Sequence, residues 1–325
     1  MSDSSFTGDS SSPSLFRQRS WRAAWEWCVQ QVLFLCAGLS IVTMAGIVFV
    51  LLNESVYSVL GDQAFFQEIP LWKFLTGTRW HWDSGEFGVW PLLTSTLQVA
   101  LIGGLVSVPL GLCSAIYLSE YATPRTRRVI KPTLELLAGV PTVVYGYFAL
   151  MFVTPYVLRP LFGLVGLEVG TFNGLAAGIV VGIMITPLVA SLSEDAIRSV
   201  PQSLREAAYA LGSTRFDVSV RVVVPAAFSG IVAACLLAIS RAIGETMAVV
   251  IAGGQNTPGG GLAINPLREV FTMTSYIVNV SSSDVEAGSM EYKSLYAVGL
   301  TLFVITLLMN IVSQWVMRRF REAYQ

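Results

Sequence analysis

Charge, histidine and lysine are scarce in this sequence. Charged residues make up 13% of its 325 residues, hydrophobic residues make up 54%, and His81 is the one histidine. A soluble domain carries about 25% charged residues, so the composition excludes a soluble enzyme, a disordered chain and a nucleic-acid binder with a basic face. The four cysteines have no CxxC spacing, and one histidine cannot complete a two-histidine motif. We therefore expect neither a disulfide framework nor a zinc site.

The shortage of lysine bears on nucleotide binding. The chain contains only Lys73, Lys131 and Lys293, and none of them follows a glycine. A phosphate-binding P-loop needs the pattern GxxxxGK[ST], so this chain does not itself bind ATP in that manner. We expect no cofactor in the chain.

Six long apolar runs account for most of the sequence. Each is long enough to cross a hydrocarbon core of about 30 Å as a helix. The runs cover residues 32–52, 92–118, 134–158, 172–192, 226–252 and 295–317. Glu135 lies near the start of the third run, and Arg241 and Glu245 lie inside the fifth. The expected fold is an all-α integral membrane protein with six transmembrane helices.

The basic residues between these runs predict the orientation, because cytoplasmic loops are enriched in Lys and Arg. Fourteen basic residues fall on the side that holds both ends of the chain: Arg17, Arg19, Arg22, Arg125, Arg127, Arg128, Lys131, Arg198, Arg205, Arg215, Arg221, Arg318, Arg319 and Arg321. The five on the other side are Lys73, Arg79, Arg159, Arg268 and Lys293. Both termini are therefore predicted to be cytoplasmic.

The same map predicts how the chain is divided. Residues 1–28 are Ser-rich and polar at their start and are expected to form a flexible tail. Residues 29–90 hold the first helix and an outer loop, 91–318 hold a core of five helices, and 319–325 form a second tail. The long outer loops, 53–91 and 253–294, are compatible both with a docking surface for an external partner and with a solvated cap.

Three glycines recur every four residues in the fourth run. Gly174, Gly178 and Gly182 share one face of a helix, where the missing side chains let another backbone approach closely. We expect these glycines to serve helix packing.

The inner loop 193–225 is the longest loop on its side and carries a distinctive spacing. Its marker residues are Glu206, Ala207, Ala208, Gly212 and Pro225. Ser203 and Glu206 have the spacing of a capping box, so a short helix is predicted to begin there. Small residues give this helix low relief, which suits a groove in a soluble partner, although an ordinary amphipathic helix at the membrane surface is the other interpretation.

Two charges lie deep in the fifth run. Arg241 and Glu245 each cost about 2.5–3.5 kcal/mol at the centre of a spanning helix, and at a spacing of four they are expected to pair on one face. The pair either stabilises the helix alone or lines a substrate pathway, and the pathway is favoured because intramembrane charges face the interior or a wet cavity. Arginine presents a planar fork of donors that matches oxyanions. Glu245 is expected to hold and partly neutralise that fork, and Thr246 adds a hydroxyl.

The spacing in the inner loop resembles the EAA loop of ABC importer permeases. The matching residues are Glu206, Ala207, Ala208, Gly212 and Pro225, whereas Val222 and Val224 stand where isoleucine and leucine are usual. The resemblance implies the architecture of type I importer permeases. It also implies that this loop docks into a separate ATPase subunit, which agrees with the missing P-loop.

Two further stretches resemble the phosphate-specific permeases, nearest to the PstC type. Residues 241–247 read RAIGETM, which is similar to the RAxGETM stretch of that family, and residues 139–146 read GVPTVVYG, which is similar to its IPSVVYG stretch. Sister permeases of the PstA type tend to continue GET with Ala-Pro, whereas Met247 and Ala248 follow here.

This resemblance implies an ATP-driven phosphate importer in a bacterial inner membrane. The implied partners are a second permease of the PstA type, two ATPase subunits of the PstB type that bind ATP and Mg²⁺, and an external phosphate-binding protein of the PstS type. Closure of the ATPases would move the loop near Glu206, and phosphate would pass near Arg241. The alternatives are a sulfate or molybdate permease and, from a different class, a membrane-embedded enzyme acting on lipid phosphates. Such an enzyme would need metal-binding carboxylates that the apolar runs lack.

Overall fold

The computed structural model describes residues 14–57, 63–81, 85–256, 261–286 and 288–319. The chain divides into two units, Met1–Leu52 and Asn53–Gln325. The outermost parts of the two expected tails, residues 1–13 and 320–325, lie outside the described residues.

The first unit is built on one long helix. Helix α1 covers Ser14–Ser55, and its stretch Trp25–Ser55 is long and apolar enough to cross a membrane. Residues 14–28, which were expected to be a tail, are therefore helical. They contain no proline or glycine, so nothing in them interrupts the helix.

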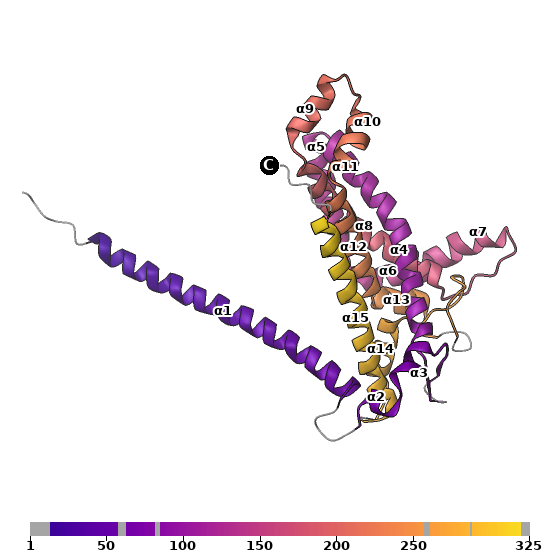
Figure 1. Ribbon diagram of the computed structural model, residues 1–325. Coiled ribbons are helices and arrows are strands. Elements are labelled where there is room, and N and C mark those ends of the chain that lie inside the picture. Colours follow the sequence, from indigo (N-terminus) through magenta and orange to yellow (C-terminus); the bar gives the residue numbers. More distant parts are fainter. Residues whose placement is uncertain (1–13, 58–62, 82–84, 257–260, 287, 320–325) are drawn as a thin grey trace, which may run out of the picture. The chain divides into compact units, whose positions relative to one another are not determined.

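In the second unit, long helical elements run between two ends that carry the shorter elements (Figure 1). The long elements are α4 (Trp90–Ile116) with its π-helical continuation η1 (Tyr117–Tyr121), α6 (Thr142–Phe148) with η2 (Ala149–Leu158) and α7 (Arg159–Gly163), α8 (Gly174–Arg198), α12 (Phe228–Ile243) and α15 (Met290–Arg319). One end carries α5 (Pro124–Ala138), α9 (Gln202–Ala210), α10 (Arg215–Asp217), η3 (Val218–Val223) and α11 (Val224–Ala226). The other end carries α2 (Phe65–Glu68), α3 (Leu71–Thr76), the hairpin of β1 (Trp80–His81) and β2 (Glu86–Phe87), and α14 (Met273–Ser282). Helix α13 (Met247–Gly253) packs against α6 and α8 between these ends.

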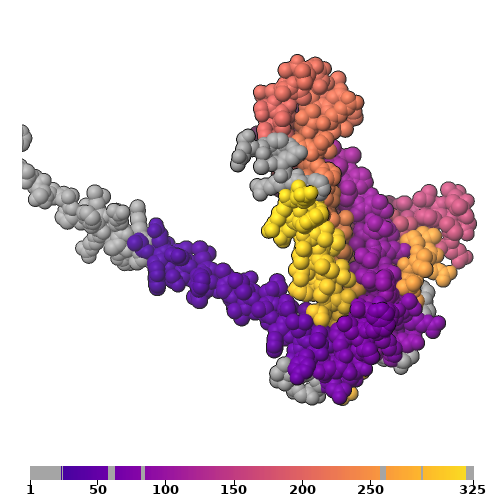
Figure 2. Space-filling model, in the orientation of Figure 1, coloured from indigo at the N-terminus to yellow at the C-terminus, as the bar shows by residue number. Residues whose placement is uncertain are grey.

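The prediction of six spans is confirmed in number, although two of the spans differ in form. Within the described residues, five helical stretches are long and apolar enough to cross a membrane, and a sixth is formed by Arg215–Ala226 and Phe228–Ile243 if this pair, bent by 71°, counts as one. Most of α8 is buried inside the chain, whereas α15 is largely exposed along one face (Figure 2).

The predicted bounds of the third and fifth spans are wrong. The third span is Thr142–Gly163 rather than 134–158, because a turn at Gly139–Pro141 ends α5 first, so that Glu135 lies on a separate helix. Proline at 141 cannot continue the helix and pushes the preceding residue away from helical geometry. The fifth run, expected as one helix over 226–252, is interrupted between Ile243 and Met247.

The core of the second unit is the contact between α4 and α8. A Cβ added at Gly178 would lie 2.6 Å from Ile102 Cβ, and one added at Gly182 would lie 2.7 Å from Val106 Cβ. The roles are reversed further along the pair, where a Cβ added at Gly111 of α4 would lie 2.7 Å from Val189 Cβ of α8. The contact partners advance in the same direction along both helices, so α4 and α8 run parallel, as two helices that cross the membrane in the same sense must.

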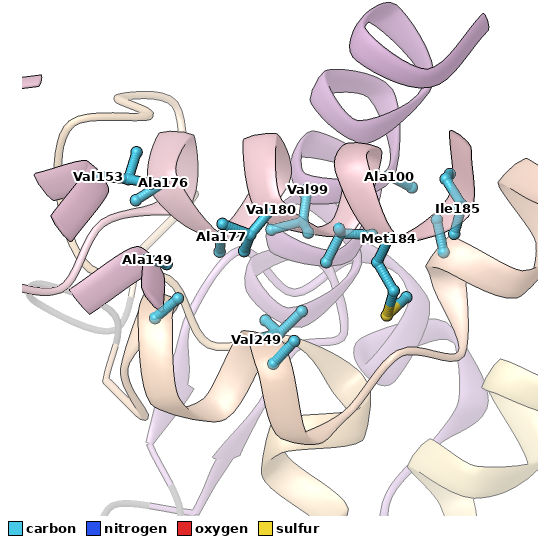
Figure 3. Close-up of a cluster of buried hydrophobic side chains, with 14 of the residues drawn as sticks. Val99, Ala100, Ala149, Val153, Ala176, Ala177, Val180, Met184, Ile185 and Val249 are labelled. Carbon is cyan, nitrogen blue, oxygen red and sulfur yellow. The ribbon is translucent and has the colours of Figure 1, made fainter. Parts of the chain in front are cut away.

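The remaining glycine of the predicted stripe lies against α4 and, more closely, against the outer segment that contains Val270. A Cβ at Gly174 would lie 2.8 Å from Val270 Cγ1 and 3.4 Å from the side-chain oxygen of Gln98. Beside Gly174, small and β-branched side chains fill the space between α4, α8 and α13. Figure 3 shows Val99 from α4, Val180 from α8 and Val249 from α13 converging there.

The two long outer loops fold together into one packed layer. Phe65 and Phe74 from the first loop share a buried cluster with Tyr276 from the second, and the rings of Trp80 and Tyr276 meet edge to face at 4.9 Å. Lys293 Nζ lies 2.7 Å from Glu68 Oε1 and joins α15 to this layer. The loops therefore form a cap with its own aromatic core.

We expect Gly178→Val to destabilise the folded chain by about 1–3 kcal/mol, because overpacking a dense interface forces the two helices apart. The measurement is the midpoint of thermal unfolding of the purified protein in detergent. Gly163→Val on α7 is the matched control, since a Cβ there has nothing within 4 Å. Equal midpoints for the two variants would contradict the assigned contact.

Candidate functional site

The inner-loop motif forms a helix that presents small residues outward. Helix α9 exposes Glu206, Ala207 and Ala210 and buries Ala208. The predicted helix is present, but the predicted capping box is wrong: α9 begins at Gln202 after Pro201, and no side chain caps it. Pro201 favours this boundary because proline disfavours helical geometry at the residue before it and so separates α9 from α8.

Gly212 ends this helix for a conformational reason. Its φ is +80°, a left-handed conformation that glycine adopts without steric cost. The N–H of Gly212 donates to Tyr209 O at 2.9 Å, and that of Ser213 donates to Ala208 O at 3.2 Å. This is the Schellman arrangement, which satisfies the last carbonyls of the helix. The spacing between Ala208 and Gly212 is thus set by the geometry of a helix end.

After this turn the chain folds back against α9 and leads into a spanning helix. Val218 and Val223 are buried in one cluster with Ala208, Ala115 and Ile197. Pro225 lies exposed in α11, immediately before the 71° bend into α12. The exposed inner surface and the helix that carries Arg241 are therefore consecutive pieces of chain.

Arg241 lies near the middle of the membrane-crossing layer. Ile239, two residues before it on α12, packs against Gly104, where an added Cβ would lie 3.5 Å from Ile239 Cγ1. Gly104 is near the midpoint of α4, and two residues of helix add about 3 Å along the axis. Arg241 is exposed in this chain, and no hydrogen bond or ion pair joins its side chain to the described residues.

Glu245 does not pair with Arg241, so the predicted pairing at helical spacing is wrong. Helix α12 ends at Ile243, and residues 244–246 are not helical. The Glu245 carboxylate instead accepts a hydrogen bond from Ala248 N at 3.3 Å at the start of α13, while the Thr274 hydroxyl donates to Glu245 O at 2.9 Å. Thr246 donates its hydroxyl to Gly244 O at 3.3 Å.

The structure brings the two remaining motif stretches together. A Cβ at Gly146 would lie 3.0 Å from Cα and O of Ala248, so the missing side chain lets α6 and α13 touch backbone to backbone. Tyr145 donates its hydroxyl to Leu137 O at 2.9 Å and thereby satisfies a carbonyl at the end of α5. Two interrupted helices, one broken at Gly139–Pro141 and the other at residues 244–246, therefore pack against each other.

A buried carboxylate at the inner end escaped the sequence analysis. The Glu194 side chain is fully buried and forms ion pairs with Arg127, with Lys131 at 2.9 Å and with Arg198 at 3.9 Å. The hydrogen bond to Glu194 raises the pKa of Lys131 above its usual value, against the opposing effect of partial burial. The sequence analysis used these basic residues only for orientation. The signal that could have found the cluster is the acidic pair Glu194 and Asp195 directly after an apolar run.

Side chains that could bind a metal ion do not gather at one place in the described residues. Within the part of the chain that the structure describes, no three or more His, Cys, Asp or Glu side chains gather in a way that could hold a metal ion.

The sequence matches the family described as "Binding-protein-dependent transport system inner membrane component" over residues 107–322. A probable ABC transporter permease, YqgH of Bacillus subtilis, is 34% identical over 250 residues, which cover 76% of this chain and 78% of that protein. The phosphate transport system permease protein PstC of Mesorhizobium japonicum is 34% identical over 261 residues, with the same two coverages.

The fold agrees with that family. A solved bacterial ABC transporter chain, involved in the import of the acidic polysaccharide alginate, superposes with a TM-score of 0.61 at 14% identity, covering 94% of this chain and 100% of that chain. The architecture is that of type I ABC importer permeases. The chain is a multi-pass membrane transport component and not a catalyst, which removes the lipid-phosphate enzyme from consideration. It belongs to the family of binding-protein-dependent transport system inner membrane components.

Proposed function

We propose that this chain is a transmembrane subunit of an ATP-driven importer of inorganic phosphate. It forms the translocation pathway together with a second permease subunit of the PstA type. Two ATPase subunits of the PstB type bind ATP and Mg²⁺, the inner loop of this chain docks into an ATPase subunit, and an external binding protein of the PstS type delivers phosphate. This chain itself holds no cofactor.

The observation that carries this proposal is the position of Arg241. Arg241 lies at the end of α12, close to the level of the middle of α4 and directly before the interruption in the fifth span, and its side chain has no hydrogen-bond or ion-pair partner among the described residues. An intramembrane charge faces a cavity or the protein interior rather than lipid, and a guanidinium fork matches the oxygens of phosphate. The names of relatives such as PstC of Mesorhizobium japonicum support phosphate as the anion.

Glu245 and Thr246 complete this pathway segment in a different way from that expected. The Glu245 carboxylate caps the start of α13, and its backbone carbonyl accepts a hydrogen bond from the Thr274 hydroxyl. Together these bonds fix the interruption in place. Arg241 thereby keeps its full charge toward a passing anion. Broken helices at mid-membrane are a recurrent way of lining substrate sites in transporters.

The arrangement of charge supports a bacterial inner-membrane location with both termini cytoplasmic. Arg127, Lys131, Arg198 and Arg205 gather at the end that carries α9, whereas Lys293 lies at the opposite end. Under the positive-inside rule the α9 end is cytoplasmic, where ATP is available. The exposed residues Glu206, Ala207, Gly212 and Pro225 then form the surface that meets the ATPase, whereas Ala208, expected in that surface, is buried and anchors α9 from beneath.

Arg241→Gln should reduce phosphate uptake by about ten- to hundredfold, because a hydrogen bond to a charged group contributes about 1.5–3 kcal/mol. Uptake of radiolabelled phosphate by the reconstituted complex is the measurement, with co-purification of all subunits showing that it assembles. Arg241→Lys should fall between wild type and Arg241→Gln, since it keeps the charge but loses the fork.

Normal uptake by Arg241→Gln would contradict the pathway role. Uptake of sulfate or molybdate in preference to phosphate by the wild-type complex would assign the chain to another oxyanion importer.

Glu206→Lys and Gly212→Asp should each lower recovery of the ATPase with the permease by at least about tenfold. The first reverses a charge at the docking surface, and the second forces a side chain into a left-handed turn. Quantitative pull-down with a tagged permease is the measurement. Glu26→Lys, the same charge reversal on α1, serves as the control, and recovery equal to that control would refute docking at this surface.

A further inference from the structure

Arg205 lies next to the exposed Glu206 but points back into the chain. Its side chain is 12% exposed, and its guanidinium reaches three acceptors. Nη1 donates to Val200 O at 2.6 Å, while Nη2 donates to Ile197 O at 2.8 Å and to Glu120 Oε1 at 3.2 Å. One side chain of α9 therefore binds the end of α8 and the π-helical end of α4 at once.

The chemistry of these acceptors suits arginine. Ile197 O and Val200 O lie at the carboxyl end of α8, where carbonyls lack helical partners and the helix dipole is negative. The Glu120 side chain is 9% exposed, so removal of Arg205 would leave a poorly hydrated carboxylate without its counter-ion. Lysine carries its three donors on one nitrogen and has no planar fork, so it cannot place two nitrogens against these acceptors as Arg205 does.

The rest of the attachment of α9 is covalent and apolar. Residues Ser199–Pro201 connect α9 to α8 along the chain, and Ala208 is the single residue that α9 itself buries among the described residues. Ala208 and the partly buried Leu204 pack against the cluster that contains Ala115 and Ile197. Arg205 adds a polar link to α8 and η1 beside this apolar contact. Through that link α9 is joined to both helices of the α4–α8 pair, whose glycines pack without intervening side chains.

We propose that Arg205 is a positioning residue that makes α9 move as one body with α4 and α8, so that displacement of α9 by the ATPase reaches the membrane layer. The proposal rests on the proposed function, because it assigns a mechanical role within the ATPase-coupling surface. Loss of the link would leave an ATPase that docks and hydrolyses ATP while transport fails.

The test compares Arg205→Gln, Arg205→Lys and Glu120→Gln in the complete complex reconstituted into liposomes. We measure ATPase recovery, ATP hydrolysis and phosphate uptake, and take the ratio of phosphate moved to ATP hydrolysed. For Arg205→Gln we expect normal recovery, continued hydrolysis and a ratio lowered by at least about tenfold. Arg205→Lys and Glu120→Gln should lie between that variant and wild type.

Arg221→Gln is the matched control in the same loop. Arg221 pairs with Asp217 at 3.5 Å, but its side chain is 80% exposed, and exposed ion pairs contribute little. We expect its ratio to equal that of wild type. An unchanged ratio for Arg205→Gln, or a loss of uptake that tracks a loss of ATPase recovery, would overturn the proposal.

A second readout separates linkage from folding. In a chain whose cysteines are replaced, spin labels at Ser203 on α9 and Tyr121 at the end of η1 report the distance between the two elements. We expect one narrow distribution through the ATP cycle in wild type and a broad one in Arg205→Gln, whereas an equally narrow distribution in the variant would refute the link. If the wild-type complex moves another oxyanion, the proposed substrate fails, and the ratio is measured with that anion instead.

Discussion

The close contact between α4 and α8 is the constraint on which the second unit depends. In lipid there is little hydrophobic gain from bringing two helices together, so their association rests on packing at short range. The absent side chains at Gly178, Gly182 and Gly111 permit that range and fix the parallel register. Helix α12 then crosses at Gly104, and α13 fills the space beside Ala177 and Val180. The place of Arg241 in the layer follows from these contacts.

Much of this fold could be predicted because it depends on residues that are close together in the sequence. Long apolar runs gave the number of spans, and the stripe Gly174, Gly178 and Gly182 gave a packing face. The interruption at residues 244–246 was not predicted, because Arg241 and Glu245 have helical spacing and no proline lies between them; Gly244, which caps the end of α12, is its one local signal. It is held locally by the hydrogen bond from Ala248 N to the Glu245 carboxylate. From a distance it is held by the Thr274 hydroxyl on Glu245 O and by the backbone contact of Ala248 with Gly146.

Charges show a similar division between local and distant information. Counting basic residues indicated which end is which, and the count needs no knowledge of partners. The pairing of Arg205 with Glu120, and of Lys131 with Glu194, joins residues far apart in the chain. Residues 134–138 were assigned to the third span because they are largely apolar, as the span itself is. Only Gly139 and Pro141 mark the end of α5 and the start of a separate helix.

The bend between α11 and α12 converts a rotation at the inner surface into a displacement of Arg241. Helices Arg215–Ala226 and Phe228–Ile243 meet at 71° across one residue, Ala227, which is itself buried. With a rise of 1.5 Å per residue, Arg241 lies about 21 Å from this corner, so a rotation of about 10° there carries the guanidinium by about 4 Å. Such a displacement exceeds the length of a hydrogen bond. Under the proposed function, a small tilt at the inner face is therefore enough to offer phosphate a donor or to withdraw it.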